Sequence, residues 1–248
     1  MDGGDSFTEV NNGLTNSFIR ALSIDSDNTN IIYAGTYGGG VFKSENSGST
    51  WIVVNTDLTN LFVQTLSIDP DNTSIIYAGT YGGGVFKSTD AGDNWVVPST
   101  GPNNPYIQAL AIDPDDTDTL YAGTFGGGVF KSTDAGDTFS ATNTGLTRLF
   151  VQTFAIDPDI TTIVYAGTIG GGVFESSDGG TTWSAIDRDL DDSSVLALAI
   201  DPENPTIVYI GTVAEGIFKI PEGRRFSSDG GDGNCFITTS RRSLSREP

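Results

Sequence analysis

The chain has 248 residues, with 32 acidic and 12 basic side chains, no histidine and one cysteine, and its formal charge is −20. These counts exclude Ser-His-Asp and Cys-His nucleophile systems, imidazole-ligated metals, an intrachain disulfide framework and Cys-rich zinc sites. The excess of carboxylates also argues against nucleic-acid partners, because a binder must neutralise phosphates with Lys or Arg. We interpret the charge itself as a source of solubility.

The first fifteen residues are polar and acidic, which is not the pattern of a signal peptide. The sequence contains no run of about 18 apolar residues, so we expect no insertion into a membrane. We also expect neither a cofactor nor a bound metal.

From its first residues the chain is a tandem repeat. A tyrosine followed by a near-copy of Ala-Gly-Thr recurs at a spacing of 44 residues. These tyrosines are Tyr33, Tyr77, Tyr121, Tyr165 and Tyr209.

Each repeat contains four short segments with the composition of strands. In the second repeat these are residues 62–68, 75–80, 85–88 and 95–97, separated by Gly, Asp, Asn and Thr at hairpin lengths. About 44 residues and four strands is the size of a β-propeller blade, in which each sheet buries its faces against its neighbours. The sequence therefore predicts an all-β, five-bladed β-propeller over residues 1–220.

The fifth repeat, residues 195–220, contains only its first three strands. Residues 7–10 are in register with the missing fourth strand, so we expect the N-terminal strand to complete the last blade and remove two open edges. The alternative is that the chain is a piece of a larger ring, cut at a repeat boundary.

Residues 221–248 leave the repeat. A Gly/Asp linker leads to a polar, Arg-containing end, and we expect this tail to be disordered. Within it, Cys235-Phe-Ile-Thr-Thr resembles the Cys-Phe-Ile-Ala-Thr tail of some secreted bacterial and archaeal proteins, although the continuation differs.

The turn before the aromatic residue of each repeat has the pattern Ser-x-Asp-x-Gly-x-Thr-Trp, as at Ser176 to Trp183. In such a turn the Asp or Asn side chain accepts backbone N–H bonds and glycine takes a positive φ, so we expect a structural role. The Asp or Asn residues are Asp2, Asn46, Asp90, Asp134 and Asp178.

These five turns resemble the Asp-box, or bacterial neuraminidase repeat. The family includes sialidases, xyloglucan-cleaving glycosidases, sortilin-type receptors, lectins and photosystem II assembly factors. The Ile-Asp-Pro and Tyr-Ala-Gly-Thr signatures are most similar to the assembly-factor-like and glycosidase-like bacterial repeats. The resemblance implies that the boxes lie opposite the ligand-binding face. Sialidases of this family bind the substrate carboxylate with three arginines and carry an Arg-Ile-Pro motif. Sialidase activity is disfavoured here, because the only arginines within residues 1–220 are Arg20, Arg148 and Arg188, and Arg-Ile-Pro is absent.

If the strands alternate in direction, the loops opposite the Asp-boxes carry aromatic and polar side chains, with Phe62, Tyr106 and Phe150 nearby. Such side chains are suited to stacking on sugar rings or to a flat protein partner. Three glutamines that share one register of the repeat could add polar groups to this face. Alternatively, the aromatic rings fill gaps between blades and the glutamines cap the packing there. The candidate binding residues are Tyr37, Tyr81, Phe125, Gln64, Gln108, Gln152 and Arg20.

The fifth repeat departs from the others by replacing Gly-Gly-Gly with Ala-Glu215-Gly and by placing Asp191 and Asp192 in the preceding loop. A pair of carboxylates on one face is the requirement for acid/base cleavage of a glycosidic bond. Such catalysis also requires burial and a raised pKa, and we expect these loops to be exposed. We therefore predict a monomeric, non-enzymatic binding module for a glycan or a protein surface. The alternatives are a glycoside hydrolase and an assembly scaffold. The family resemblance favours an extracellular or cell-surface location.

Overall fold

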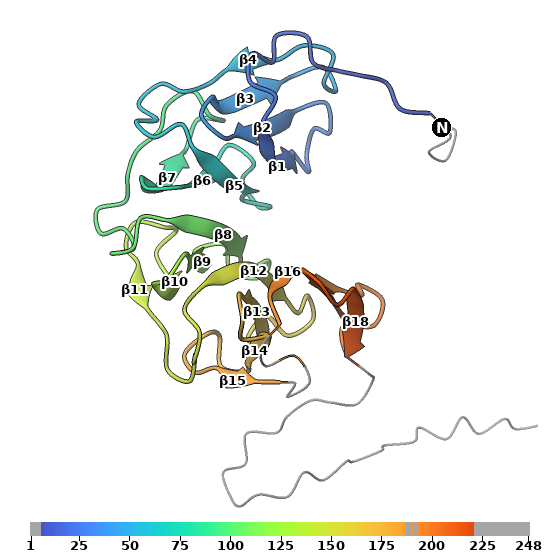
Figure 1. Ribbon diagram of the computed structural model, residues 1–248. Coiled ribbons are helices and arrows are strands. Elements are labelled where there is room, and N and C mark those ends of the chain that lie inside the picture. The colour runs from blue at the N-terminus through green and yellow to red at the C-terminus, as the bar shows by residue number, and fades with distance from the viewer. Residues whose placement is uncertain (1–5, 187–189, 191–192, 221–248) are drawn as a thin grey trace, which may run out of the picture.

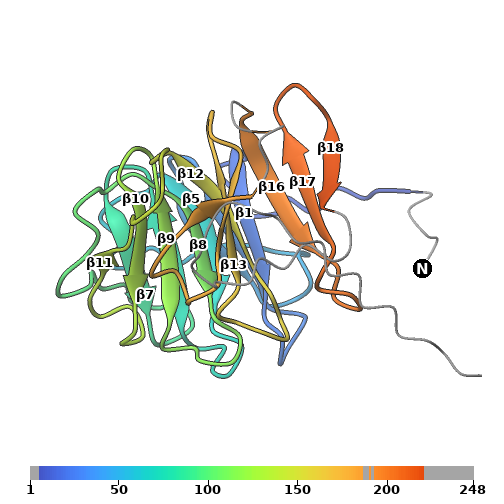
Figure 2. The same cartoon turned by 90° about the horizontal axis from the view of Figure 1, so that it is seen from below.

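The computed structural model describes residues 6–186, 190 and 193–220. These residues form eighteen β-strands in five antiparallel sheets, which we number units one to five in chain order. Figure 1 shows the units following one another along an open arc from blue to red, and Figure 2 shows the same arc from below.

The strands of each unit are hydrogen-bonded in chain order. The first strands are β1 (Ile19–Ile24), β5 (Val63–Ile68), β8 (Ile107–Ile112), β12 (Val151–Ile156) and β16 (Val195–Ile200). The second strands are β2 (Ile32–Thr36), β6 (Ile76–Thr80), β9 (Leu120–Thr124), β13 (Val164–Thr168) and β17 (Val208–Thr212). The third strands are β3 (Gly40–Ser44), β7 (Gly84–Ser88), β10 (Gly128–Ser132), β14 (Val173–Ser176) and β18 (Ile217–Ile220). The fourth strands are β4 (Ile52–Val53), β11 (Ser140–Ala141) and β15 (Ser184–Ala185).

The first strands of consecutive units contact one another, so they form the inner side of the arc. The arrangement confirms an all-β fold of repeated antiparallel sheets, as the 44-residue period predicted. Not every sheet has the expected four strands. In unit two, only a single bridge joins Lys87 to Val96 where residues 95–97 were expected to form a strand. Pro98 follows immediately and has no backbone N–H to extend the pairing.

The expected closure of the last unit by the N-terminal strand is not present. Residues 6–10 form no strand, Phe7 is 95 % exposed, and unit five consists of three strands ending at β18. The N-terminal segment is held instead on unit one, where the Trp51 side chain donates a 2.7 Å hydrogen bond to the carbonyl of Val10. Units one and five lie at opposite ends of the arc, so this anchorage keeps the segment away from β18 (Figure 1).

The core lies between the units. Tyr77 and Val85 of unit two pack with Ile107 and Leu120 of unit three in one buried cluster, and equivalent clusters occur at the other junctions. Gly79 permits the close approach, because a Cβ added there would lie 2.6 Å from the side chain of Ile107. Each inner sheet is therefore buried on both faces by its two neighbours.

No helix of the described residues is long and apolar enough to cross a membrane. The expected disordered tail, residues 221–248, lies outside the described residues, and so does Asp2 of the N-terminal turn.

Candidate functional site

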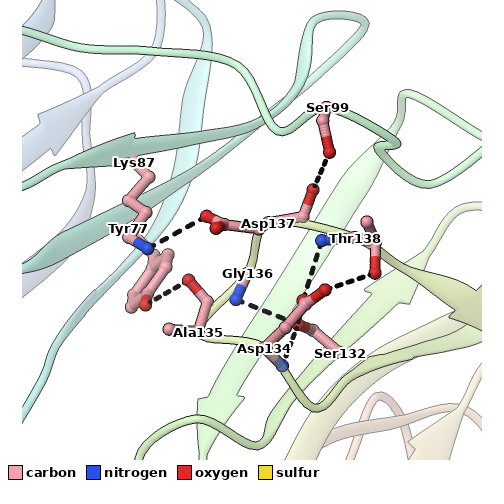
Figure 3. Close-up of polar contacts among 9 residues, drawn as sticks. All are labelled: Tyr77, Lys87, Ser99, Ser132, Asp134, Ala135, Gly136, Asp137 and Thr138. Atoms are coloured by element: carbon pink, nitrogen blue, oxygen red, sulfur yellow. Dashed lines mark hydrogen bonds and ion pairs between the residues drawn. The ribbon is translucent and has the colours of Figure 1, made fainter.

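The Asp-box-like turns are built by their own side chains, as Figure 3 shows for unit three. Asp134 accepts hydrogen bonds from the backbone N–H of Thr138 at 2.8 Å, the Thr138 hydroxyl at 2.6 Å and the Ser132 hydroxyl at 2.8 Å. Ala135 and Gly136 take positive φ angles of 53° and 80°. The bond from the backbone N–H four residues on recurs at Asn46, Asp90 and Asp178. These bonds hold each turn together.

Hydrogen bonding lowers the pKa of three of these carboxyl groups. At Asp90 and Asp134 the largest cause is the side chain four residues on, Asn94 or Thr138. At Asp178 burial acts in the opposite direction, but the bonds from the backbone and hydroxyl of Thr182 and from Ser176 outweigh it, so its pKa is also lowered. A carboxylate stabilised in its ionised form is a good acceptor and a poor proton donor, which argues against a catalytic role.

Another set of aspartates follows the first strand of each unit. In the first unit Asp25 is buried and accepts the backbone N–H groups of Asp27 and Asn28. The same pattern recurs at Asp69, Asp113, Asp157 and Asp201. These aspartates therefore cap turns, and no cluster of three or more acidic or cysteine residues within the described ranges could hold a metal ion.

Aromatic pairs occupy the junctions between units on the face opposite the Asp-box-like turns. Tyr37 of unit one bridges to Phe62 at the start of unit two, and their ring centroids are 4.8 Å apart. The equivalent pairs are Tyr81 with Tyr106, at 4.8 Å, and Phe125 with Phe150, at 4.7 Å. Five of these six rings are 36–43 % exposed, and Tyr81 is partly buried. The rings therefore pack against each other at the junctions and also present surface to solvent.

Amide side chains accompany the aromatic pairs. Asn60 accepts the backbone N–H of Phe62 and directs its amide group toward the carbonyl of Tyr81 at 3.4 Å. Asn16 and Asn104 repeat this arrangement in the neighbouring units. These asparagines were not among the predicted site residues, although their 44-residue spacing is visible in the sequence.

The aromatic pairs, together with Phe18, form a surface that we call the aromatic face. Arg20 lies at its unit-one end. Its guanidinium carbon lies 5.2 Å from the ring centroid of Phe18 and 5.5 Å from that of Tyr37. Arg20 is exposed, so its charge remains accessible to a partner at this end of the face.

The three glutamines predicted to share a register each lie at a β-bulge, where the pairing of the first strand with the second shifts by one residue. The pairing of the first strand with the second shifts between Val63 and Thr65, where Gln64 stands, and Gln108 and Gln152 occupy the same shift in their units. All three are partly buried on the inner strands of the arc. The bulge repeats at Arg20 and Leu196, so it belongs to the repeat.

The residues considered for hydrolysis are only partly placed. Glu215 is exposed and accepts a 2.6 Å hydrogen bond from the hydroxyl of Ser193. Asp191 and Asp192 lie outside the described residues. The described part of unit five therefore does not show the pair of carboxylates that the hydrolase alternative requires.

A concavity of about 380 Å³ lies between units three and four, on the side of the Asp-box-like turns. It is lined by Lys131 and several threonines, including Thr138 and Thr142, but by none of the exposed aromatic residues. The amino group of Lys131 is already bonded to the carbonyl of Gly179 at 2.8 Å. We therefore place the candidate site on the aromatic face and not in this concavity.

No family model and no curated protein matches the chain. Among solved structures, an ancestral GH74 enzyme matches 84 % of this chain and 29 % of its own at 23 % identity, with a TM-score of 0.69. The GH74 xyloglucanase from Xanthomonas campestris matches 79 % of this chain and 34 % of its own at 19 % identity, with a TM-score of 0.63.

The extracellular domain of a B. thetaiotaomicron protein described as a hybrid two component system matches 86 % of this chain and 30 % of its own at 16 % identity, with a TM-score of 0.66. At these identities the likeness shows a shared propeller-like fold. The chain spans only about a third of the length of the three proteins it resembles.

Proposed function

We propose that the protein is a binding module that recognises a glycan through the aromatic face, made up of Phe18, Tyr37, Phe62, Tyr81, Tyr106, Phe125 and Phe150. The observation that carries the proposal is the repetition of an exposed aromatic pair at three consecutive junctions. We further propose that the five units are Asp-box propeller blades, as their turns suggest.

Aromatic surfaces of this kind suit sugars because the C–H faces of a pyranose stack on aromatic rings. Hydrogen-bonding groups must accompany the rings, since a sugar hydroxyl that loses water needs a partner. Asn16, Asn60 and Asn104 stand beside the rings, and Gln64, Gln108 and Gln152 lie on the adjoining inner strands. Together with Arg20 at one end, these groups would supply donors and acceptors along the whole face.

The charge of the chain favours a neutral ligand. The formal charge is −20, and a field of one sign repels anions and lowers their local concentration. We therefore expect binding to uncharged oligosaccharides and weak or no binding to sialylated or sulfated ones. The name of the Xanthomonas neighbour refers to xyloglucan, a neutral polysaccharide, which is consistent with this choice.

The hydrolase alternative has less support than binding. A glycosidase of the common type needs two carboxylates roughly 5 to 10 Å apart. Glu215 is the one candidate carboxylate placed by the structure, and it is exposed and bonded to Ser193. The GH74 likeness concerns the fold, and fold alone does not assign chemistry.

We propose an extracellular location, because one structural neighbour is itself an extracellular domain and GH74 enzymes share the fold.

A glycan array that contains neutral and anionic oligosaccharides tests this proposal. The wild-type chain should bind a neutral class, and the variant Tyr37→Ala, Tyr81→Ala and Phe125→Ala should lose the signal. The matched control is Ile52→Ala with Val97→Ala, which removes exposed apolar side chains from the outer edges of units one and two. A blank array with folded protein would overturn glycan binding and favour a protein partner on the same face.

A further inference from the structure

The two end sheets of the arc expose faces that every inner sheet buries. On unit one Leu22 is 66 % exposed, whereas Leu66 at the same position of unit two is 7 % exposed. On unit five Ile217 is 80 % exposed, whereas its counterparts at positions 41, 85, 129 and 173 are at most 2 % exposed. Contiguous exposed apolar surface is a mark of interaction sites.

The two exposed faces are the two halves of an interface that the chain already forms four times. At the last junction, Tyr165 and Val173 of unit four share a buried cluster with Val195 of unit five, and Leu198 and Ile200 pack against it. The free face of unit five presents Tyr209 and Ile217 at the positions of Tyr165 and Val173. The free face of unit one presents Ile19, Leu22 and Ile24 at the positions of Val195, Leu198 and Ile200.

Polar groups at the two ends match in the same way. In the first three junctions a tyrosine hydroxyl donates to a carbonyl in the Asp-box turn of the next unit: Tyr33 to Ala91, Tyr77 to Ala135 and Tyr121 to Gly179. Tyr209 is the tyrosine of this set at the free end, 41 % exposed. Ser47 occupies the acceptor position in unit one, and its φ of 56° is close to the 57° of Ala91.

The N-terminal segment extends this complementarity. In units two and four the Trp side chain donates to a carbonyl in the outer segment of the preceding unit, at Val54 and Thr142. Trp51 makes the same bond to Val10, so residues around Val10 stand where the outer strand of a preceding unit would be. Unit five lacks an outer strand within the described residues, and the edge of β18 is unpaired.

We propose that a second copy of this chain covers the free face, with unit five of one copy packing on unit one of the next. Within the described residues the end sheets of one chain share no core cluster and lie at opposite ends of the arc (Figure 1). A second copy can supply the missing neighbour of each end sheet. Residues 7–10 of the incoming copy would then pair with β18. The joint is head-to-tail, so it allows dimers and longer assemblies. It differs from the monomer expected from the sequence.

The charge of the chain sets the conditions for the joint. Two copies of charge −20 repel each other, and salt screens this repulsion beyond a Debye length of about 8 Å at 0.15 M. Association driven by apolar burial should therefore strengthen as the salt concentration rises, whereas an assembly held by ion pairs would weaken.

The test uses light scattering on the full chain over a range of concentrations and salt. The variants Leu22→Asp and Ile217→Asp each place a charge in one half of the joint, and Val97→Asp places one on the outer edge of unit two as a control. Wild type and Val97→Asp should reach at least twice the mass of one chain, and each end variant alone should stay monomeric. All three changes are at exposed positions, so the variants should fold. Circular dichroism checks that they do.

Mixing the two end variants separates a head-to-tail joint from other modes of association. The intact unit five of Leu22→Asp can bind the intact unit one of Ile217→Asp, so an equimolar mixture should form dimers and nothing longer. A wild-type chain that remains monomeric up to its solubility limit, as a self-closed ring would, overturns the proposal. A mixture that stays monomeric, or end variants that still dimerise alone, would overturn it as well.

Discussion

The hydroxyl of Tyr77 donates a 2.8 Å hydrogen bond to the main-chain carbonyl of Ala135, 58 residues away in the next unit. The tyrosine is fully buried and the carbonyl belongs to the turn that Asp134 organises (Figure 3). This bond links the tyrosine of one unit to the turn of the following unit. It gives a physical reason for the Tyr and the Asp-box-like turn to recur with one period.

Replacement of Tyr77 by Phe should destabilise the protein. The ring remains in place, but the carbonyl of Ala135 loses its donor, which costs about 1–3 kcal/mol of unfolding free energy. Urea denaturation measures the effect. The control is Tyr106→Phe, whose side chain is exposed, and its midpoint should stay close to that of wild type. Equal midpoints for Tyr77→Phe and wild type would show that the bond contributes nothing.

Acid should weaken the Asp-box-like turns. Because the folded-state pKa values of Asp90, Asp134 and Asp178 lie below the ordinary value of 3.8, the unfolded chain binds protons first as the pH falls. The stabilisation is complete above the unfolded pKa and is lost as the pH falls through the folded pKa. Thermal melting between pH 7 and pH 2 should therefore show a decline that begins near pH 4.

Asn46 provides a natural control for that acid effect. Its amide oxygen accepts the same hydrogen bond from the backbone N–H of Thr50, but the amide does not titrate. The variant Asp134→Asn should therefore keep the fold and lose less stability between pH 4 and pH 2 than wild type. Asp134→Ala should be less stable at every pH. If Asp134→Asn followed the acid profile of wild type, the decline would have to come from other carboxylates.

Alkaline titration should reveal the buried tyrosines. Burial is the main cause that raises the pKa of Tyr33, Tyr77 and Tyr121, and nearby carboxylates such as Asp25, Asp69 and Asp113 add to it. A raised folded pKa contributes stability that is present below the unfolded value of about 10 and is lost as the pH rises. Absorbance of tyrosinate should thus appear in two phases, the second coinciding with unfolding. A single phase near pH 10 with the fold intact would contradict this.

Gly79 should not tolerate a side chain. A Cβ there would lie 2.6 Å from both Ile107 and Thr65, so Gly79→Ala forces two units apart and should cost about 1–3 kcal/mol. Gly101→Ala is the matched control, because nothing lies within 4 Å of its added Cβ. Comparison of the two denaturation midpoints measures the penalty, and equal midpoints would show that the junction can relax.

The repeat made much of the fold predictable. The recurrence of residues such as Tyr77, Gly79 and Asp134 with a 44-residue period was sufficient to predict repeated antiparallel sheets. The curvature of the arc was not predictable, because it depends on how side chains such as Val63 and Leu66 pack between sheets. For that reason the matching ends suggested a closure that the structure does not contain.

The candidate site was predicted in part. Tyr37, Tyr81 and Phe125 were identifiable because an aromatic residue recurs beside the glycine turn. Their pairing with Phe62, Tyr106 and Phe150 depends on bridges between different units, which no local pattern specifies. The bulges at Gln64, Gln108 and Gln152 also depend on pairing with the second strand, so the alternation of residues gave no sign of them.

The most direct test of the central claim is a calorimetric titration with the neutral oligosaccharide that gives the strongest array signal. The three similar aromatic pairs predict more than one site per chain, fewer sites in Tyr81→Ala, and no binding when Tyr37, Tyr81 and Phe125 are all replaced by Ala. Unchanged affinity and stoichiometry in the folded triple variant would show that the aromatic face does not bind the glycan.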